Sequence, residues 1–174
     1  FRGMPTPHLN YTGVSNLRTC TGNVAYFTAF RLDNAIMLSA LAAQVATGVS
    51  SNVRLALYKV AHNGTAIKLC ETSDLSTASA GFISGSVTFG ILPAGWYYTG
   101  IGAKTTSVSM GAHNAGSVSA YNMGGDPLGR DGDGVPYGFS SEAWSATDLP
   151  SSPALSSKTL ITSEYPAAVF LVPA

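Results

Sequence analysis

The feature of this sequence that most limits the fold is a series of short runs in which apolar and other side chains alternate. The clearest run is Asn52–Val60 (NVRLALYKV), whose alternation is that of a strand with one buried face. Asn63-Gly64 follows, and an Asn-Gly pair between two apolar runs predicts a tight hairpin, because both turn positions need a positive φ. Ile67–Thr72 is then the expected partner strand, so this part of the chain predicts an antiparallel pair.

Further runs of this kind are separated by turn signals such as Leu92-Pro93-Ala94-Gly95, where Pro presets φ and Gly accepts the left-handed region. The additional strands that we predict are Val24–Arg31, Ser84–Phe89, Gly95–Ile101, Val118–Tyr121 and Tyr165–Val172. About eight short strands with frequent turns predict an all-β sandwich or barrel. Phe1–Ser15 is rich in Pro and Gly and is expected to be an extended leader, with residues 16–174 as one domain.

One segment gives conflicting signals. Ala35–Thr47 (AIMLSALAAQVAT) has high helix propensity, and Asn34 and Gly48 are suitable residues for its two ends. It lacks a polar face, however, and a period of two fits it as well. We predict a buried strand, because a lone helix in an all-β chain is the rarer arrangement.

The small number of charges excludes several functions. Charged residues are 10% of the chain, and nine Lys and Arg balance nine Asp and Glu. This is well under the roughly 25% usual in soluble domains. Nucleic-acid binding needs a basic patch, and membrane insertion needs a run of about 18 apolar residues, so neither is expected. Ser, Thr, Asn and 19 Gly supply the polarity instead, which is typical of extracellular or virion proteins.

No sequence motif predicts a catalytic centre. His8, His62 and His113 fall in the leader, a predicted turn and a Gly-rich stretch, and none lies beside a cysteine. A serine nucleophile motif is also absent from the sequence. Cys20 and Cys70 are expected to be half-buried free thiols, with a bridge between them as the alternative.

A candidate binding region lies in Tyr121–Pro153, a long stretch rich in Gly, Asp, Ser and Pro that is expected to be irregular. Aromatic rings can stack on the apolar faces of sugars, while Asp, Asn and Arg bind hydroxyls, and loops on a rigid scaffold often carry function. The candidate glycan-binding residues are Tyr121, Asn122, Asp126, Arg130, Asp131, Asp133, Tyr137 and Trp144, with Phe139 in the same stretch. The alternative is that these aromatic residues only hold a long loop against the body.

Three segments of the chain carry motifs in a specific order. Val53–Tyr58 reads VRLALY and is followed by Asn63-Gly64, Leu92–Tyr98 reads LPAGWYY, and Pro166–Leu171 lies near the end. Together they resemble a module at the C-terminal ends of bacteriophage tail fibres, which has a V-R-L-G-I-Y strand, a hairpin after it, an L-P-x-G-W-Y-W motif and a similar end. Ala56 stands where the family often has Gly, and the resemblance says little about residues 105–160.

The resemblance implies a jelly-roll-like antiparallel β-sandwich that forms a homotrimer at the tip of the tail fibre. It implies attachment of the virion to a bacterial surface polysaccharide or lipopolysaccharide. The family has no shared catalytic residue to carry over to this chain, and we expect no cofactor. The alternatives are a structural tail or baseplate module that binds no receptor, and a glycan depolymerase.

The acidic residues of the candidate binding region bear on two further chemistries. Asp126–Asp133 resembles an oxygen-rich Ca²⁺ loop but lacks the distal Glu of an EF-hand, so we expect Asp-Gly turns and no metal. A depolymerase needs paired carboxylates, for which the candidates are Asp126, Asp131, Asp133, Glu142 and Asp148. Phage depolymerases usually have long repeat-built β-helices, and this chain shows no internal repeat. We therefore expect a protein that is not an enzyme.

Overall fold

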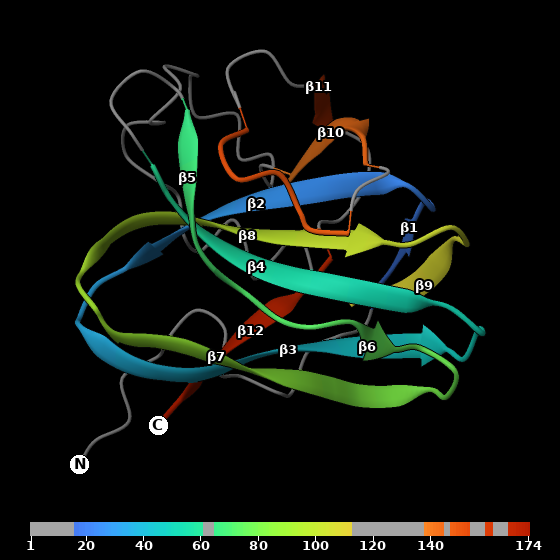
Figure 1. Ribbon diagram of the computed structural model, residues 1–174, viewed down its shortest axis with the longest axis horizontal. Coiled ribbons are helices and arrows are strands. Elements are labelled where there is room, and N and C mark those ends of the chain that lie inside the picture. Colours follow the sequence, from blue (N-terminus) through green and yellow to red (C-terminus); the bar gives the residue numbers. More distant parts are fainter. Residues whose placement is uncertain (1–15, 61–64, 113–137, 145–146, 154–158, 162–166) are drawn as a thin grey trace.

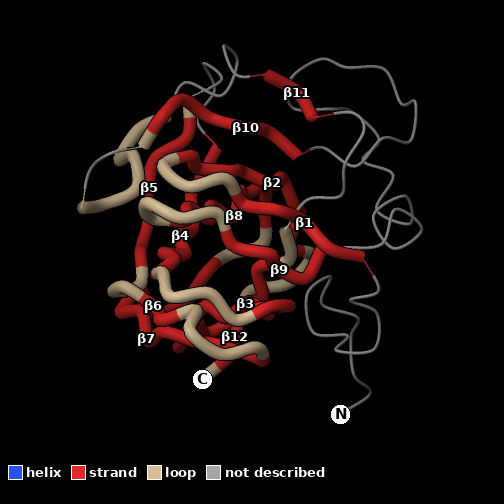
Figure 2. Tube along the Cα trace, turned by 90° about the vertical axis from the view of Figure 1, so that its right-hand side faces the viewer, coloured by secondary structure: helices blue, strands red, loops and turns tan. Residues whose placement is uncertain are grey.

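A computed structural model describes residues 16–60, 65–112, 138–144, 147–153, 159–161 and 167–174. These residues form twelve strands and no helix, and the strands belong to two antiparallel sheets that pack together (Figure 1). In Figure 2, which is turned by 90°, β2, β8 and β4 of one sheet lie above β3, β7 and β12 of the other. The predicted all-β antiparallel sandwich is confirmed.

The first sheet has five strands, and its longest members, β3 and β7, pair along most of their length. On its other edge β3 pairs with β12 through its middle and with β9 at its C-terminal end. The strands of this sheet are β1 (Asn16–Cys20), β9 (Val108–Ala112), β3 (Ile36–Thr47), β12 (Val169–Pro173) and β7 (Gly81–Leu92).

The second sheet has seven strands, with β8 and β4 at its centre. Their pairing runs from Val53 opposite Ala103 to Lys59 opposite Tyr97. The order along the sheet is β11 (Thr159–Ile161), β10 (Gly138–Ala143), β2 (Val24–Leu32), β8 (Gly95–Ala103), β4 (Asn52–Val60) and β5 (Ala66–Glu71), with the short β6 (Leu75–Ser76) also on β4.

The main core lies between the two sheets and follows from the alternation in the sequence. Successive side chains of a strand point to opposite faces, so Leu55 and Leu57 of β4 reach the same core as Leu41 and Val45 of β3. A second cluster lies on the other face of the seven-stranded sheet, where Phe27 meets Tyr58 edge to face, with ring centroids 5.2 Å apart. Strands of this sheet therefore bury residues on both faces.

The ambiguous segment Ala35–Thr47 is a strand, as predicted, and forms β3 from Ile36 onward. Its helix propensity is overridden by partners on both edges, which satisfy its backbone groups with ladder hydrogen bonds. Val24–Arg31 and Gly95–Ile101 are also confirmed, as β2 and β8. Ser84–Phe89 is the middle of the longer β7.

The prediction that Tyr121–Pro153 is irregular is wrong for Gly138–Ala143, which forms β10 and pairs with β2. The run GFSSEA has no apolar alternation, so its strand state comes from its partner and not from its own side chains. The predicted C-terminal strand is described from Val169 onward. The Asn63-Gly64 turn, the predicted strand Val118–Tyr121 and the leader lie outside the described residues.

The short strands β1, β6, β9 and β11 were not predicted. β9 (VSMGA), for example, is too short to show a period, and its pairing with β1 and β3 decides its conformation. The described residues contain no helix that is long and apolar enough to cross a membrane.

Candidate functional site

A polar depression lies at one end of the sandwich, where three connections meet. They are the β3–β4 connection, the segment around β6 and the connection from β8 to β9, at the right of Figure 1. The depression is open to solvent and has a volume of about 420 Å³. Its lining residues are Ser50, Ser51, Asn52, Asp74, Ser76, Ala78, Lys104 and Thr105.

Backbone hydrogen bonds fix the three connections to one another. The Lys104 N–H donates to the Asn52 carbonyl (2.9 Å), and the Ser51 Oγ donates to the Lys104 carbonyl (3.1 Å). The Thr77 N–H donates to the Ser51 carbonyl (3.0 Å), and the Val49 N–H donates to the Thr77 carbonyl (2.8 Å). The depression is therefore formed before any ligand arrives, which reduces the ordering cost of binding.

Several polar side chains of the depression have unused hydrogen-bonding capacity. Within the described part of the chain, the side chains of Ser50, Asn52 and Thr105 form no hydrogen bond. An amide and two hydroxyls provide both donors and acceptors in one place. This combination suits a ligand that also presents donors and acceptors together.

The one carboxylate of the depression is held as an anion. Asp74 accepts hydrogen bonds from the Lys104 ammonium and from the Arg54 guanidinium, whose Nε lies 2.5 Å from its Oδ1. The hydrogen bond from Lys104, together with that from Arg54, holds the pKa of this carboxyl below its usual value. At neutral pH the depression therefore carries a compensated ion pair rather than a net charge.

A network of ion pairs behind the depression fastens a neighbouring segment to the sheet. Arg54 pairs with Asp74, Glu71 and Asp148, and Glu71 also pairs with Lys68. The Glu71 carboxylate is largely buried and accepts the N–H of Leu149 (2.8 Å). This network holds residues 147–153, which we call the strap, along β5.

Of the eight glycan-binding candidates that the sequence predicts, Trp144 alone is among the described residues. Tyr121, Asn122, Asp126, Arg130, Asp131, Asp133 and Tyr137 lie outside the described residues, as does the Asp126–Asp133 loop. Trp144 is described and is only 3% exposed, with its indole N–H donating to the Asp148 carbonyl (2.8 Å). A buried indole offers no open face to a sugar ring, so packing is the role that the structure shows for Trp144.

The two cysteines are free, as predicted, and the alternative bridge is wrong. Cys70 is half-buried as expected, whereas Cys20 is fully buried. Burial raises the pKa of Cys20 to about 12, although Arg18 opposes the shift, and raises that of Cys70 to about 11. Both sulfurs stay protonated at neutral pH, whereas a nucleophile or metal ligand must be a thiolate. The described residues contain no group of three or more His, Cys, Asp or Glu placed to hold a metal.

Sequence reasoning missed the depression because its residues come from three separate segments. Ser50-Ser51-Asn52, Asp74 with Ser76, and Lys104-Thr105 each have the ordinary composition of a turn. Only the pairing of β4 with β6 and β8 brings them together. Comparisons of the chain with protein-family models, with curated proteins and with solved structures found no match.

Proposed function

We propose that this chain is the receptor-binding head of a bacteriophage tail fibre, and that it attaches the virion to a bacterial surface polysaccharide or lipopolysaccharide without cleaving it. It acts as a homotrimer at the tip of the fibre. The motifs that carry the resemblance support this proposal through their positions. VRLALY lies in β4 and LPAGWYY in the β7–β8 connection and β8, so both belong to the framework and not to variable loops.

The observation that carries the proposal is the preformed polar depression with its unpaired side chains. Sugars are neutral and carry a hydroxyl on most carbons, each of which is a donor and an acceptor. Asn52, Ser50 and Thr105 offer matching groups, and the ionised Asp74 can accept from hydroxyls. The volume of about 420 Å³ falls within the roughly 300–1,000 Å³ of small-ligand sites.

The lining also predicts that each site binds weakly. None of the residues that line the depression is aromatic, so stacking does not add to the hydrogen bonds there. Neutral hydrogen bonds contribute only about 0.5–1.5 kcal/mol each once competition with water is included. A trimer that presents several sites to a repeating polysaccharide gains avidity without stronger contacts.

Binding of labelled protein to bacteria before and after removal of their surface polysaccharide tests the proposed function. We expect strong binding to intact cells of a suitable strain and its loss from stripped cells, with no release of reducing ends. Unchanged binding to stripped cells would contradict a glycan receptor. Absence of binding to every strain in a broad panel would favour the structural tail module instead.

The role of the depression is tested by the double variant Ser50→Ala/Asn52→Ala. Two lost hydrogen bonds predict a decrease in affinity of roughly 10-fold. The matched control is Ser151→Ala/Ser152→Ala, which removes two exposed hydroxyls from the strap. Equal affinity of the two double variants for the purified glycan would exclude the depression as the binding site while leaving cell attachment intact.

A further inference from the structure

The Asp74 carboxylate in the depression has acceptor capacity that its two cations do not use. Arg54 Nε donates to its Oδ1 (2.5 Å) and Lys104 Nζ donates to its Oδ2, so each oxygen accepts one hydrogen bond from the described residues. An ionised carboxyl offers about four lone pairs over its two oxygens. Acceptor capacity therefore remains on each oxygen, and the side chain is 35% exposed, so a ligand in the depression can reach it.

Two acceptor sites on the neighbouring oxygens of one planar group suit two donors that are held side by side. Adjacent hydroxyls of a sugar are such a pair, because the ring fixes their separation. A hydrogen bond to an ionised acceptor is also stronger than one between two neutral groups. Asp74 is therefore the strongest acceptor that the lining of the depression offers to a sugar.

The groups around Asp74 can bind the oxygens of the same hydroxyls. An ammonium has three donors, and that of Lys104 uses one of them on Asp74. The side chain of Asn52 lines the same depression and adds an amide donor. A hydroxyl that donates to Asp74 keeps its lone pairs, so it can accept from these donors at the same time.

The charges at the depression cancel one another. Of the residues that line it within the described part of the chain, only Asp74 and Lys104 are charged. The ion pairs that connect them to the sheet contain three cations and three anions, which are Arg54, Lys68, Lys104, Glu71, Asp74 and Asp148. A ligand with its own carboxylate or phosphate would meet no uncompensated cation there and would be repelled by the ionised Asp74.

The connection that carries Lys104 is held in a fixed conformation. The next residue, Thr105, has a φ of 27°, which a β-branched residue rarely adopts. Ser51 Oγ lies within hydrogen-bond distance of the carbonyls on either side, those of Lys104 (3.1 Å) and Thr106 (3.4 Å). An added Cβ at Gly22 would lie 2.4 Å from the Thr105 carbonyl oxygen, so the β1–β2 turn packs directly against this residue. Strained backbone persists only where its surroundings fix it, so a ligand has to fit the charges as they stand.

We propose that the depression selects a neutral sugar unit whose two adjacent hydroxyls donate to the two oxygens of Asp74, and that it rejects sugars that carry a carboxylate or phosphate. Asp74 is then the residue that determines specificity. This inference rests on the proposed function and narrows its ligand to the neutral units of a surface polysaccharide or lipopolysaccharide.

The probe for the test is the surface polysaccharide purified from a strain to which the protein attaches. One portion is left untreated. A second is oxidised at its primary hydroxyls, which adds carboxylates and keeps the adjacent hydroxyls of the ring. A third is treated with periodate, which cleaves the bond between carbons that carry adjacent hydroxyls, and is then reduced. We expect the wild type to bind the untreated form at least 10-fold more tightly than the other two.

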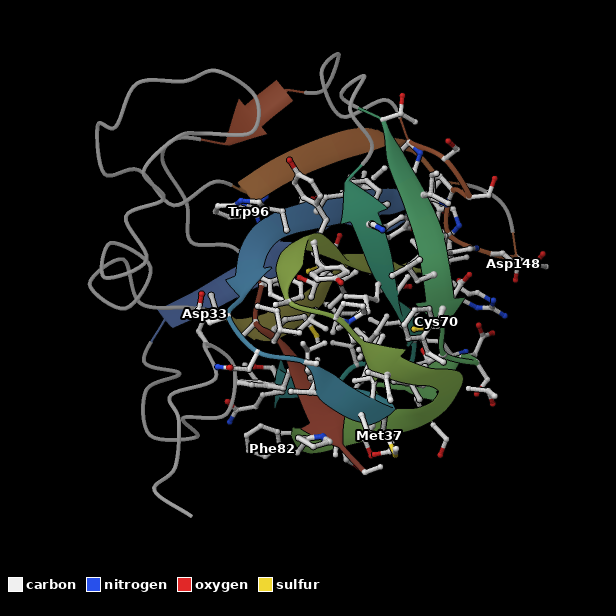
Figure 3. All side chains as sticks on the ribbon, turned by 90° about the vertical axis from the view of Figure 1, so that its left-hand side faces the viewer. Asp33, Met37, Cys70, Phe82, Trp96 and Asp148 are labelled. Atoms are coloured by element: carbon white, nitrogen blue, oxygen red, sulfur yellow. The ribbon has the colours of Figure 1, made fainter. Side chains whose placement is uncertain are left out.

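A matched pair of variants tests the role of Asp74. Asp74→Asn keeps the shape of the side chain and removes its charge, whereas Asp148→Asn removes a charge from another partner of Arg54. Asp148 does not line the depression; its side chain is 65% exposed and lies at the outer edge of the molecule in Figure 3. Circular dichroism checks that both variants are folded.

The two variants should differ in preference and not only in affinity. Asp74→Asn should bind the untreated form about 10-fold or more weakly, because it loses hydrogen bonds to a charged group. It should also bind the oxidised form better than the wild type does, since Lys104 then has no anion beside it in the depression. Asp148→Asn should keep the affinity and the preference of the wild type.

The salt dependence of binding gives a second measurement. Affinity of the wild type for the untreated form should change less than about 2-fold between 50 and 500 mM NaCl, because neither partner brings a net charge to the contact. Affinity of Asp74→Asn for the oxidised form should decrease over the same range, because that contact joins opposite charges.

Several results would overturn the inference. Tighter binding of the oxidised form by the wild type, or an unchanged preference in Asp74→Asn, would exclude selection for neutral sugars, while attachment to cells would still support the proposed function. Binding that survives periodate would exclude adjacent hydroxyls as the donors. An equal loss in Asp148→Asn would assign the effect to the ion-pair network. If the wild type attaches to no strain, the proposed function fails and this inference fails with it.

Discussion

Trp144 and Gly102 form a contact whose disruption can be predicted in detail. The indole of Trp144 lies on β8 at Gly102, where an added Cβ would come within 2.7 Å of the Trp144 ring and of Leu149 Cδ2. The glycine is therefore needed for this close approach of the ring to the sheet. The sequence alone marked Trp144 as a glycan-binding candidate, and the structure gives it a packing role, so one experiment distinguishes the two roles.

The magnitudes follow from this geometry. Trp144→Ala should reduce the free energy of unfolding by about 3–5 kcal/mol, because Gly102 has no side chain with which to fill the space left by the ring. The lost hydrogen bond to the Asp148 carbonyl adds about 1 kcal/mol. Gly102→Ala alone should cost about 1–3 kcal/mol through overpacking. In the double variant the alanine at position 102 no longer meets the indole, so the two costs should not add.

Urea denaturation of the wild type, the two single variants and the double variant measures the interaction energy between positions 102 and 144. We expect the double variant to be about 1–2 kcal/mol more stable than the sum of the single effects predicts. Glycan binding per folded molecule should be unchanged by Trp144→Ala. The packing role is refuted if Trp144→Ala costs under about 0.5 kcal/mol, or if it abolishes binding by a folded and equally stable protein.

Three further predictions concern the ion pairs and the thiols. Glu71→Ala should reduce the free energy of unfolding by about 2–3 kcal/mol, because it leaves Arg54 and a backbone N–H of the strap without this partner; urea titrations that coincide with wild type would contradict this. The hydrogen bond from Lys104 is the largest cause of the lowered pKa of Asp74 in the folded protein. The stabilisation from the ionised carboxylate is therefore present above the unfolded pKa and is lost as the pH falls through the folded pKa. The stability difference between wild type and Asp74→Asn should therefore be measurable at pH 7 and vanish well below pH 3.8, the usual value for this carboxyl; a difference independent of pH would show that the charge of Asp74 does not matter. Cys20 should resist a thiol reagent at pH 8 until the protein unfolds, since it is fully buried with a pKa of about 12; rapid labelling of native protein, located by mass spectrometry, would contradict its burial.

The sequence by itself determined where many of the strands lie and which of their faces are buried. In β4 the alternation of NVRLALYKV places Leu55 and Leu57 in the core, and the structure has the bounds that the alternation predicts. Residues i and i+2 of an extended chain share a face whatever surrounds them, so this information is local. For β3 the period of two was only compatible with a strand, and the all-β context of the chain favoured the strand over the helix propensity.

Only the tertiary structure decided which strands are neighbours, and with them the site. The run of β10 has no strand signal of its own and extends because β2 is beside it. The depression unites residues 50–52, 74–78 and 104–105. Trp144 is buried because β8 has a glycine where the ring arrives. These features depend on contacts between residues far apart in the sequence, and the period of a single strand carries no information about its partner.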